Sequence, residues 1–514
     1  MLQINNLNIY LLEDLRPLIE DFTFSLNKTD KVALIGEEGN GKSILLKAIY
    51  NKKLIEDICS VSGEIFLNNE NIAYLPQSID EEILKKTTEE YINENISYEY
   101  FDYNLYYKLI GELNFDEELI SNEKYISTLS GGERIKYILL VELMKSPSII
   151  LMDEPSNDLD LESVKWLENF MENLDIPLIF VSHDIELLSN VSNRIIHLEQ
   201  IMRRSKAKHT IASMTYQEYV EQRSLNIFNQ TKRANKDKEE FDKKMSRYRR
   251  IHDSVQDSLR ATKPNNPEVG KNLKDKMHTV KAVGKILEKE KENLEKLPDY
   301  EEEISINFDE DINVANGKVI LDMYLEKLEI AGRTLSKNIN LKVIGPEKIC
   351  IIGKNGIGKS SLLKIIIKEL KDLNLNVGYM PQTYFELEDY EMNAIEYLSH
   401  DFTKDEHSKV SSYLGSLNFK REEMYRNIKS LSGGQKAKLF FAKMNIDKCE
   451  VLVLDEPTRN LSPLSQPEII NALKLFNGSI ISVSHDRNFI NEVCDKCYEL
   501  NGEGLKILNL SSYY

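Results

Sequence analysis

The chain has 514 residues, of which 41% are hydrophobic and 29% charged, and its formal net charge is −18. This length suggests about three domains, and the apolar content excludes a disordered polymer. No stretch approaches the roughly 18 uninterrupted apolar residues of a membrane span. Because the start lacks the features of a secretory signal and the five cysteines suit a reducing compartment, we expect a cytoplasmic protein.

The net charge hides an uneven distribution. Residues 232–285 carry 16 Lys and Arg against 8 Asp and Glu, a local charge of +8, so the rest of the chain carries −26. This asymmetry matters more for partners than the total does, because a basic segment on an acidic protein can still meet nucleic acid.

The first half of the chain has the pattern of an α/β domain. Lys31–Gly36 (KVALIG) is a short apolar run typical of a buried parallel strand, and a glycine-rich turn and an apolar periodic helix (KSILLKAIY) follow. SIILMDEP and PLIFVSHD are two further buried strands. This order of strand, glycine turn, helix and parallel strand predicts a phosphate-binding core.

The glycine turn has the P-loop pattern G-x-x-x-x-G-K-S. Its glycines let backbone N–H groups surround nucleotide phosphates at the positive end of the next helix. Lys42 is expected to reach the β- and γ-phosphates, and Ser43 to place its hydroxyl on Mg²⁺. The predicted ATP-binding residues here are Gly36, Gly39, Asn40, Gly41, Lys42 and Ser43.

Three more motifs follow the P-loop. Leu129–Gly132 (LSGG) opens a helix and offers backbone N–H groups and a serine hydroxyl to an anion. Asp153 ends a strand at the sheet edge where Mg²⁺ must be held, and Glu154 is placed to polarise the attacking water. His183 follows the next strand, where a neutral imidazole can contact the γ-phosphate and Glu154, although a structural cap is the alternative for a histidine there.

Residues 224–300 carry almost no strand signal. Apolar residues recur there at heptad-like spacing, interrupted at Lys263–Pro267 (KPNNP). We predict an antiparallel helical hairpin with its tip at about residues 259–270 and arms on the order of 50 Å. The expected seams are Ala234, Phe241, Met245, Tyr248, Val255 and Leu259 in one arm, and Leu273, Met277, Val280, Leu287 and Leu294 in the other. A solvated coiled coil that only separates two domains is the alternative.

The second half repeats these motifs in the same order. Its P-loop lies at an offset of 317 residues, and its LSGG, Asp-Glu and histidine motifs lie at a constant 302. The chain is therefore a tandem duplication, with predicted domains at 1–223, 224–300 and 301–514. The repeated residues are Gly353, Asn355, Gly356, Gly358, Lys359 and Ser360, then Ser432, Gly433 and Gly434, then Asp455 with Glu456, and His485.

Two phosphate-binding loops in each half have a simple explanation. A nucleotide that is held by a P-loop does not need a second phosphate-binding loop from the same half. The LSGG of each half is therefore expected to bind the nucleotide of the other half. We therefore predict a monomer in which each ATP contacts the P-loop of one half and the LSGG of the other. ATP would hold the halves together, and hydrolysis would loosen them.

With these motifs the chain resembles the ABC-F class of ATP-binding-cassette ATPases, which have two cassettes, a charged helical linker and no membrane domain. The resemblance implies α/β folding as two tandem ABC-type P-loop domains, with ATP and Mg²⁺ as ligands. It identifies Asp153 and Asp455 as Walker B carboxylates and His183 and His485 as switch histidines. It also identifies the Q-loop residues Gln77 and Gln382, which share in holding Mg²⁺, and the signatures Ser130, Gly131, Gly132, Glu133 and Ser432, Gly433, Gly434, Gln435.

Arg16 and Arg333 occupy the region where many cassettes stack an aromatic side chain on adenine. The two arginines are separated by the same 317 residues as the P-loops. A guanidinium plane can also stack on adenine, so both are candidates, with ordinary surface arginines as the alternative.

The resemblance further implies a partner. Family members bind the ribosomal exit site and push the hairpin towards the P-site tRNA and the peptidyl-transferase centre. A bacterial 70S ribosome, with its 23S rRNA and P-site tRNA, is thus the expected partner, without a membrane partner, and a basic hairpin suits it. The effector residues at the tip would be Leu259, Arg260, Thr262, Lys263 and Asn265.

The spacing of motifs favours one subtype of the family. Gln77 to Ser130 spans 53 residues and Gln382 to Ser432 spans 50, which leaves no room for an inserted arm, and the chain ends soon after its second cassette. This looks like the antibiotic-resistance members, which release drugs such as lincosamides, pleuromutilins or group A streptogramins. A translation factor for unstressed cells and the ATPase subunit of a drug exporter are the alternatives.

The two D-loops, which follow the Asp-Glu-Pro motifs, differ. The first reads SNDLD and ends in Asp160, whereas the second reads TRNLS and has Ser462 at that place. Such a difference is found in resistance-type members and suggests two unequal ATP sites.

Overall fold

A computed structural model describes most of the chain. Described are residues 2–508 except 69, 98, 100, 158, 202–205, 262–266, 293–296, 298–307, 309–311, 331, 385–390, 402, 418 and 460. The predicted tip residues Thr262, Lys263 and Asn265, the seam residue Leu294 and the D-loop residue Asp158 lie outside this part. Contacts divide the chain into two compact units, 1–216 with 301–514, and 217–300.

The first half is built on a six-stranded sheet that is parallel except at one edge, where β8 and β9 are antiparallel. Its strands, in spatial order, are β5 (Ile72–Leu75), β6 (Ile149–Asp153), β7 (Leu178–Val181), β3 (Lys31–Ile35), β8 (Arg194–Ile201) and β9 (Lys206–Ala212). Because β6, β7 and β3 are parallel neighbours, the residues that follow them meet at one edge of the sheet.

The second half repeats this topology strand for strand. The order is β13 (Val377–Met380), β14 (Val451–Asp455), β15 (Ser479–Val483), β12 (Lys348–Ile352), β16 (Lys496–Asn501) and β17 (Gly504–Leu508). In this sheet the described β16–β17 pair is antiparallel and the other pairs are parallel. The repeated order confirms the predicted α/β fold with two tandem P-loop domains.

Smaller antiparallel sheets accompany the two central ones. In the first half the order is β2 (Pro17–Ser25), β1 (Gln3–Leu11) and β4 (Cys59–Phe66), and in the second half β10 (Val319–Ile330) pairs with β11 (Arg333–Ile344).

Helices follow the strands in both halves. In the first half they are α1 (Lys42–Tyr50), α2 (Glu81–Leu84), α3 (Thr88–Asn95), α4 (Tyr103–Leu113), α5 (Gly131–Met144), α6 (Leu161–Glu172) and α7 (Ile185–Val191). In the second half they are α10 (Lys359–Asp372), α12 (Ala394–Leu398), α13 (Lys404–Ser416), α14 (Arg421–Tyr425), α15 (Gly433–Ile446), α16 (Gln466–Leu475) and α17 (Arg487–Val493). Short 3-10 turns lie at Lys52–Leu54, Glu117–Leu119, Ile126–Thr128 and Ile428–Ser430.

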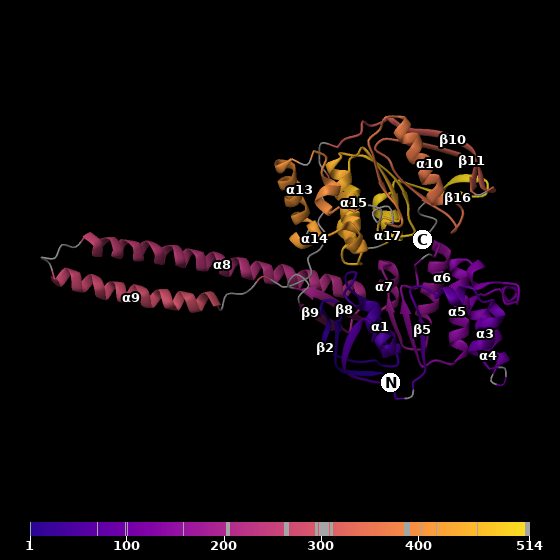
Figure 1. The fold of residues 1–514 in the computed structure, drawn as a ribbon, viewed down its shortest axis with the longest axis horizontal. Coiled ribbons are helices and arrows are strands. Elements are labelled where there is room, and N and C mark those ends of the chain that lie inside the picture. Colours follow the sequence, from indigo (N-terminus) through magenta and orange to yellow (C-terminus); the bar gives the residue numbers. More distant parts are fainter. Residues whose placement is uncertain are drawn as a thin grey trace. The chain divides into compact units, whose positions relative to one another are not determined.

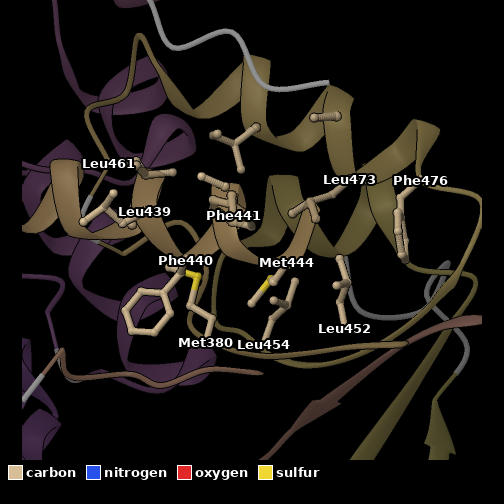
Figure 2. Close-up of a cluster of buried hydrophobic side chains, with 14 of the residues drawn as sticks. Met380, Leu439, Phe440, Phe441, Met444, Leu452, Leu454, Leu461, Leu473 and Phe476 are labelled. Carbon is tan, nitrogen blue, oxygen red and sulfur yellow. The ribbon is translucent and has the colours of Figure 1, made fainter. Parts of the chain in front are cut away.

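Apolar side chains pack on both faces of the central sheets. In β14 every residue is buried, with Leu452 and Leu454 in one core cluster and Val451 and Val453 in another. Figure 2 shows the first of these clusters, in which side chains of α15 such as Phe441 lie with those of β14. Continuous apolar strands are therefore buried because both faces are covered, as expected of a parallel sheet.

The unit of residues 217–300 is the predicted helical hairpin. It consists of α8 (Tyr216–Ala261) and α9 (Pro267–Glu292), which lie side by side in Figure 1. The predicted seam residues Phe241 and Leu287 are buried, and Lys244 forms an ion pair with Glu290 across the hairpin. A Cβ atom on Gly284 would lie 2.6 Å from the Tyr248 hydroxyl, so glycine permits close helix contact there.

Helix α8 begins earlier than expected. It starts at Tyr216, whereas the predicted linker begins at residue 224, and it contains 46 residues. The predicted boundary between the first domain and the linker therefore lies inside a continuous helix, and the hydrophobic periodicity of a continuous helix gives no boundary signal. The three-domain division itself stays a prediction. Among the described helices, none is both long enough and apolar enough to cross a membrane.

Candidate nucleotide sites

Each P-loop joins a central strand to the helix that follows it. Gly41 and Gly358 are the N-caps of α1 and α10, with φ of 92° and 98°, in the left-handed region that favours glycine. The Nζ atom of Lys42 donates to the Gly36 carbonyl at 2.7 Å, and that of Lys359 to the Gly353 carbonyl at 2.6 Å. Both lysines therefore lie folded over their own loops, as phosphate-binding lysines should.

The first residue of each P-loop must be glycine because a larger side chain would not fit there. A Cβ atom on Gly36 would lie 2.2 Å from the Leu198 carbonyl oxygen, and one on Gly353 would lie 2.6 Å from that of Leu500. These carbonyls belong to β8 and β16, the next strands of each sheet. The P-loop therefore packs closely against the neighbouring strand, and its N–H groups remain available to bind a ligand.

A Mg²⁺ site fits the residues at the ends of β6 and β14. The Ser43 hydroxyl donates to Asp153 Oδ1 at 3.1 Å, and the Ser360 hydroxyl bonds to the carboxylate of Asp455. Asp455 Oδ1 is buried and has no hydrogen-bond partner among the described residues. Hydroxyl and carboxylate oxygens are what Mg²⁺ prefers, and when bound it would neutralise charge on the phosphates.

The two predicted catalytic glutamates share an unusual backbone. Glu154 has φ of 51° and Glu456 has φ of 53°, a left-handed conformation that non-glycine residues seldom adopt. Their N–H groups donate to Val181 and Val483 at 3.0 and 2.9 Å, which holds this conformation. The carboxylates in turn accept hydrogen bonds from the N–H groups of His183 and His485 at 3.2 and 3.1 Å.

The pKa values of the two predicted switch histidines are shifted in opposite directions. His183 Nε2 lies 3.0 Å from Glu154, and although burial opposes it, this carboxylate raises the pKa of His183. His485 Nε2 lies 3.7 Å from Glu456, and burial lowers the pKa of His485 to about 3 and raises that of Glu456 to about 7. Burial therefore favours the neutral imidazole expected from sequence at His485, whereas Glu154 favours the protonated form of His183.

The LSGG loops begin helices α5 and α15 with a capping box. Ser130 accepts from the Glu133 N–H at 3.4 Å, while the Glu133 carboxylate accepts from the Ser130 N–H at 2.8 Å. Ser432 and Gln435 repeat both contacts at 3.3 and 3.1 Å. The fourth signature residue is thus explained locally, because its side chain satisfies an N–H that a helix start leaves free.

A cavity of about 600 Å³ brings together motifs from both halves of the chain within the first unit. From the second half it is lined by the P-loop residues Asn355, Gly356, Gly358, Lys359 and Ser360, with Gln382, Asp455, Glu456 and His485. From the first half it is lined by Gly131 and Arg134 of the signature helix and by Ser156, Asn157 and Leu159 of the D-loop. The cavity therefore has the composite form that the duplicated motifs predict.

Comparison with known proteins assigns the family. The sequence model described as ABC transporter matches residues 19–157 and 336–459, which together make just over half of the chain. The chain belongs to the ABC transporter family. Its two P-loop domains are ABC ATPase cassettes, so the protein is an ATPase.

Relatives that match nearly the whole chain come from the ABC-F branch. The ATP-binding protein Uup of Buchnera aphidicola is 29% identical over 520 residues, which cover 96% of this chain and 80% of that protein. ABC transporter F family member 5 of Arabidopsis thaliana is 26% identical over 537 residues, covering 94% and 72%. A solved complex of the archaeal ribosomal stalk protein aP1 with the archaeal ribosome recycling factor aABCE1 has a TM-score of 0.57 at 16% identity, and covers 98% of this chain and 89% of that chain.

The predicted adenine-contacting arginines are not among the residues that line the cavity. Arg16 lies 3.9 Å from Asp14, and Arg333 is exposed at the start of β11. Two leucines that sequence reasoning missed lie beside P-loop glycines. A Cβ atom on Gly41 would lie 3.2 Å from Leu18, and one on Gly358 would lie 3.0 Å from Leu335. The offset of 317 residues that relates these leucines was the available signal.

The Q-loop glutamines lie after equivalent strands but in different surroundings. Gln77 follows β5 and is exposed, whereas Gln382 follows β13 and lines the cavity. Ile330, at the end of β10, also lines the cavity and is a further residue that the motifs did not indicate. At the hairpin tip, Leu259 is half-buried and Arg260 is exposed.

Proposed function

We propose that this ATPase binds the bacterial 70S ribosome near the exit site, displaces the P-site tRNA with its hairpin and releases antibiotics from the peptidyl-transferase centre. It would act as a cytoplasmic monomer whose cassettes pair within the chain. The observation that carries the proposal is the combination of two ATP cassettes with a long basic hairpin in one chain that otherwise carries negative charge.

The charge of the hairpin supports RNA as its partner. Arg249, Arg250 and Lys271 are exposed along α8 and α9, while the seam between the two helices is apolar. Exposed cations on a rod attract phosphates and release their counterions, which gives salt-dependent binding to 23S rRNA and tRNA. The acidic remainder of the chain would limit unspecific contacts with RNA.

The relatives support a ribosomal role as well. They belong to the ABC-F branch, and the solved structure with a similar fold is described as a ribosome recycling factor bound to a ribosomal stalk protein. A translation factor that adjusts tRNA position in unstressed cells is the alternative within this branch. The ATPase subunit of a drug exporter is a weaker alternative, because such a subunit needs no basic hairpin.

A variant that binds ATP without hydrolysing it tests ribosome binding. We expect Glu154→Gln with Glu456→Gln to remain on ribosomes in ATP, because each change removes the carboxylate that polarises water and keeps the side-chain shape. Cosedimentation through sucrose measures this, with the same variant in ADP as the control. If the ATP-loaded variant never cosediments with ribosomes, the proposal is wrong.

Translation in vitro then separates the two roles. Purified wild-type protein should restore synthesis inhibited by a lincosamide or a pleuromutilin, and should do little for an inhibitor that acts on the small subunit. A protein that binds ribosomes but restores synthesis with none of these drugs would be the translation factor instead.

A further inference from the structure

The two P-loops carry opposite charges at matching positions. The first has Glu37 and Glu38 where the second has Lys354 and Asn355. Since nucleotide phosphates are anions, two carboxylates in a P-loop oppose the charge that the loop must accept, and a lysine favours it. The charge of the loops therefore distinguishes the two ATP sites before any contact is considered.

Both carboxylates contact the second cassette within the first unit. Glu38 Oε2 accepts a hydrogen bond of 3.0 Å from the N–H of Gly434, in the signature. Glu37 Oε1 accepts the hydroxyl hydrogens of Ser462 and Ser465, which are buried residues of the D-loop region. One acid thus holds the signature of the second cassette, and the other holds its D-loop.

The N–H of Gly434 is a donor that the signature offers to a nucleotide phosphate. It lies in the first turn of α15, a helix of 14 residues whose positive end points to this place. A carboxylate oxygen and a phosphate oxygen cannot both take this donor. We propose that Glu38 competes with the γ-phosphate of ATP at the site made of the first P-loop and the second signature, so that this site binds ATP more weakly than the other.

The other composite site lacks this competitor. There Asn355 replaces the acid, and its Oδ1 lies 3.3 Å from Lys359 Nζ. Both residues line the cavity of about 600 Å³ together with Gly131 of the first signature. An uncharged amide leaves the positive charge of the lysine for the phosphates, so the cavity keeps its preference for an anion.

The unusual second D-loop agrees with this arrangement. Ser462 stands where the first D-loop has Asp160, and it donates its hydroxyl to Glu37. An aspartate at position 462 would place a second carboxylate against Glu37, which like-charge repulsion disfavours. The acidic P-loop and the altered D-loop are therefore a matched pair, and ATP fills the second P-loop first.

Equilibrium ATP binding by the full chain tests the proposal, and it needs no ribosome, so its outcome is independent of the proposed ribosomal role. In a Lys359→Ala background, which weakens the second P-loop, the remaining ATP binding reports the first. There Glu38→Asn should lower the Kd for Mg-ATP about tenfold, because the substitution removes the repulsion between the Glu38 carboxylate and the phosphates of ATP. The Kd for ADP, which has no γ-phosphate, should change much less.

A reciprocal variant and a control complete the experiment. In a Lys42→Ala background, Asn355→Glu should raise the Kd for Mg-ATP about tenfold, by the same charge argument. Glu64→Gln, on the exposed part of β4, should change neither constant. An unchanged or weaker ATP affinity of Glu38→Asn overturns the proposal, and so does an equal shift for ATP and ADP.

Discussion

At the scale of single residues, Glu154 and Glu456, the predicted catalytic glutamates, show how the cassette holds a carboxylate in place. Their left-handed backbone costs of order 1–3 kcal/mol for a non-glycine residue. In both cassettes that cost is met by a hydrogen bond to the neighbouring strand and by one from the histidine N–H. Each carboxylate is thereby held beside the histidine that follows the next strand.

Asp184 is another residue whose surroundings decide its behaviour. It caps α7 by accepting from the N–H groups of Glu186 and Leu187 at 2.9 and 3.0 Å. Burial raises its pKa from 3.8 to about 6, with Asp486 and Glu186 adding to the rise, although Arg487 lowers it. The folded protein therefore favours the protonated acid, and this group costs stability as the pH rises from about 4 to about 6.

Asp184→Asn tests this pH dependence. Asparagine can also cap a helix but does not ionise. The free energy of unfolding of the variant relative to wild type should therefore increase by about 2.4 kcal/mol between pH 4 and pH 7.5, as a shift of this size implies. Thermal unfolding at both pH values measures the change. Asp116→Asn, at an exposed cap, should show no such trend, and equal behaviour of the two variants would contradict the prediction.

At the scale of elements, one arginine joins helices from both cassettes. Arg487 begins α17, and its guanidinium contacts Glu168 of α6 at 2.6 Å and Glu186 of α7 at 2.6 Å. Asp184, before α7, lies 3.9 Å away. Arg487 is only 7% exposed, and its charge lowers the pKa of Asp184 and Glu186 against the effect of burial. The first cassette has Ile185 at the position that corresponds to Arg487, so it has no matching arginine there.

Removing this cation should weaken the first unit strongly. We expect Arg487→Met to lower the free energy of unfolding by about 3–5 kcal/mol, because it removes a buried cation that contacts three half-buried acids. Urea denaturation measures the decrease. Arg487→Lys should recover part of it by restoring charge without the planar fork, and Arg421→Met, at the exposed start of α14, serves as the control. A decrease no larger than that of Arg421→Met would show that the cluster contributes little.

At the scale of the whole molecule, charge is separated between the hairpin and the rest of the chain. Residues 232–285 carry +8 against −26 elsewhere. If the hairpin binds ribosomal RNA, as proposed, this separation directs the interaction to one segment. Salt should then weaken ribosome binding through the hairpin cations rather than through lysines on the cassettes.

Neutralising the hairpin should reduce both affinity and its salt dependence. With Arg249, Arg250, Lys271 and Lys274 changed to Gln, the slope of log K against log salt should fall by roughly 0.7–0.9 for each phosphate that the hairpin no longer neutralises. Ribosome binding at several salt concentrations measures it, and ATP hydrolysis without ribosomes should persist. The control changes the exposed cassette residues Lys53, Lys85, Lys108 and Lys404. Equal reductions in both variants would count against the hairpin as the binding segment.

Much of the fold could be predicted because its signals are local. Continuous apolar strands, glycine turns and the repeated offsets of 317 and 302 residues predict two α/β domains, and the heptad seam predicts the hairpin. The start of α8 at Tyr216 could not be predicted, since a helix that continues across a domain border leaves no break in its periodicity.

The sequence by itself determined which residues carry the phosphate-binding motifs, because a phosphate-binding loop needs fixed residue types at fixed spacing. Only the tertiary structure decided which partners the residues of the two sites contact. His183 is paired with Glu154 and also contacts the Leu461 carbonyl at 2.5 Å, whereas Glu37 and Glu38 meet the second cassette. The contacts with Leu461 and with the second cassette join residues hundreds of positions apart, and charge and burial there depend on the packed chain rather than on local sequence.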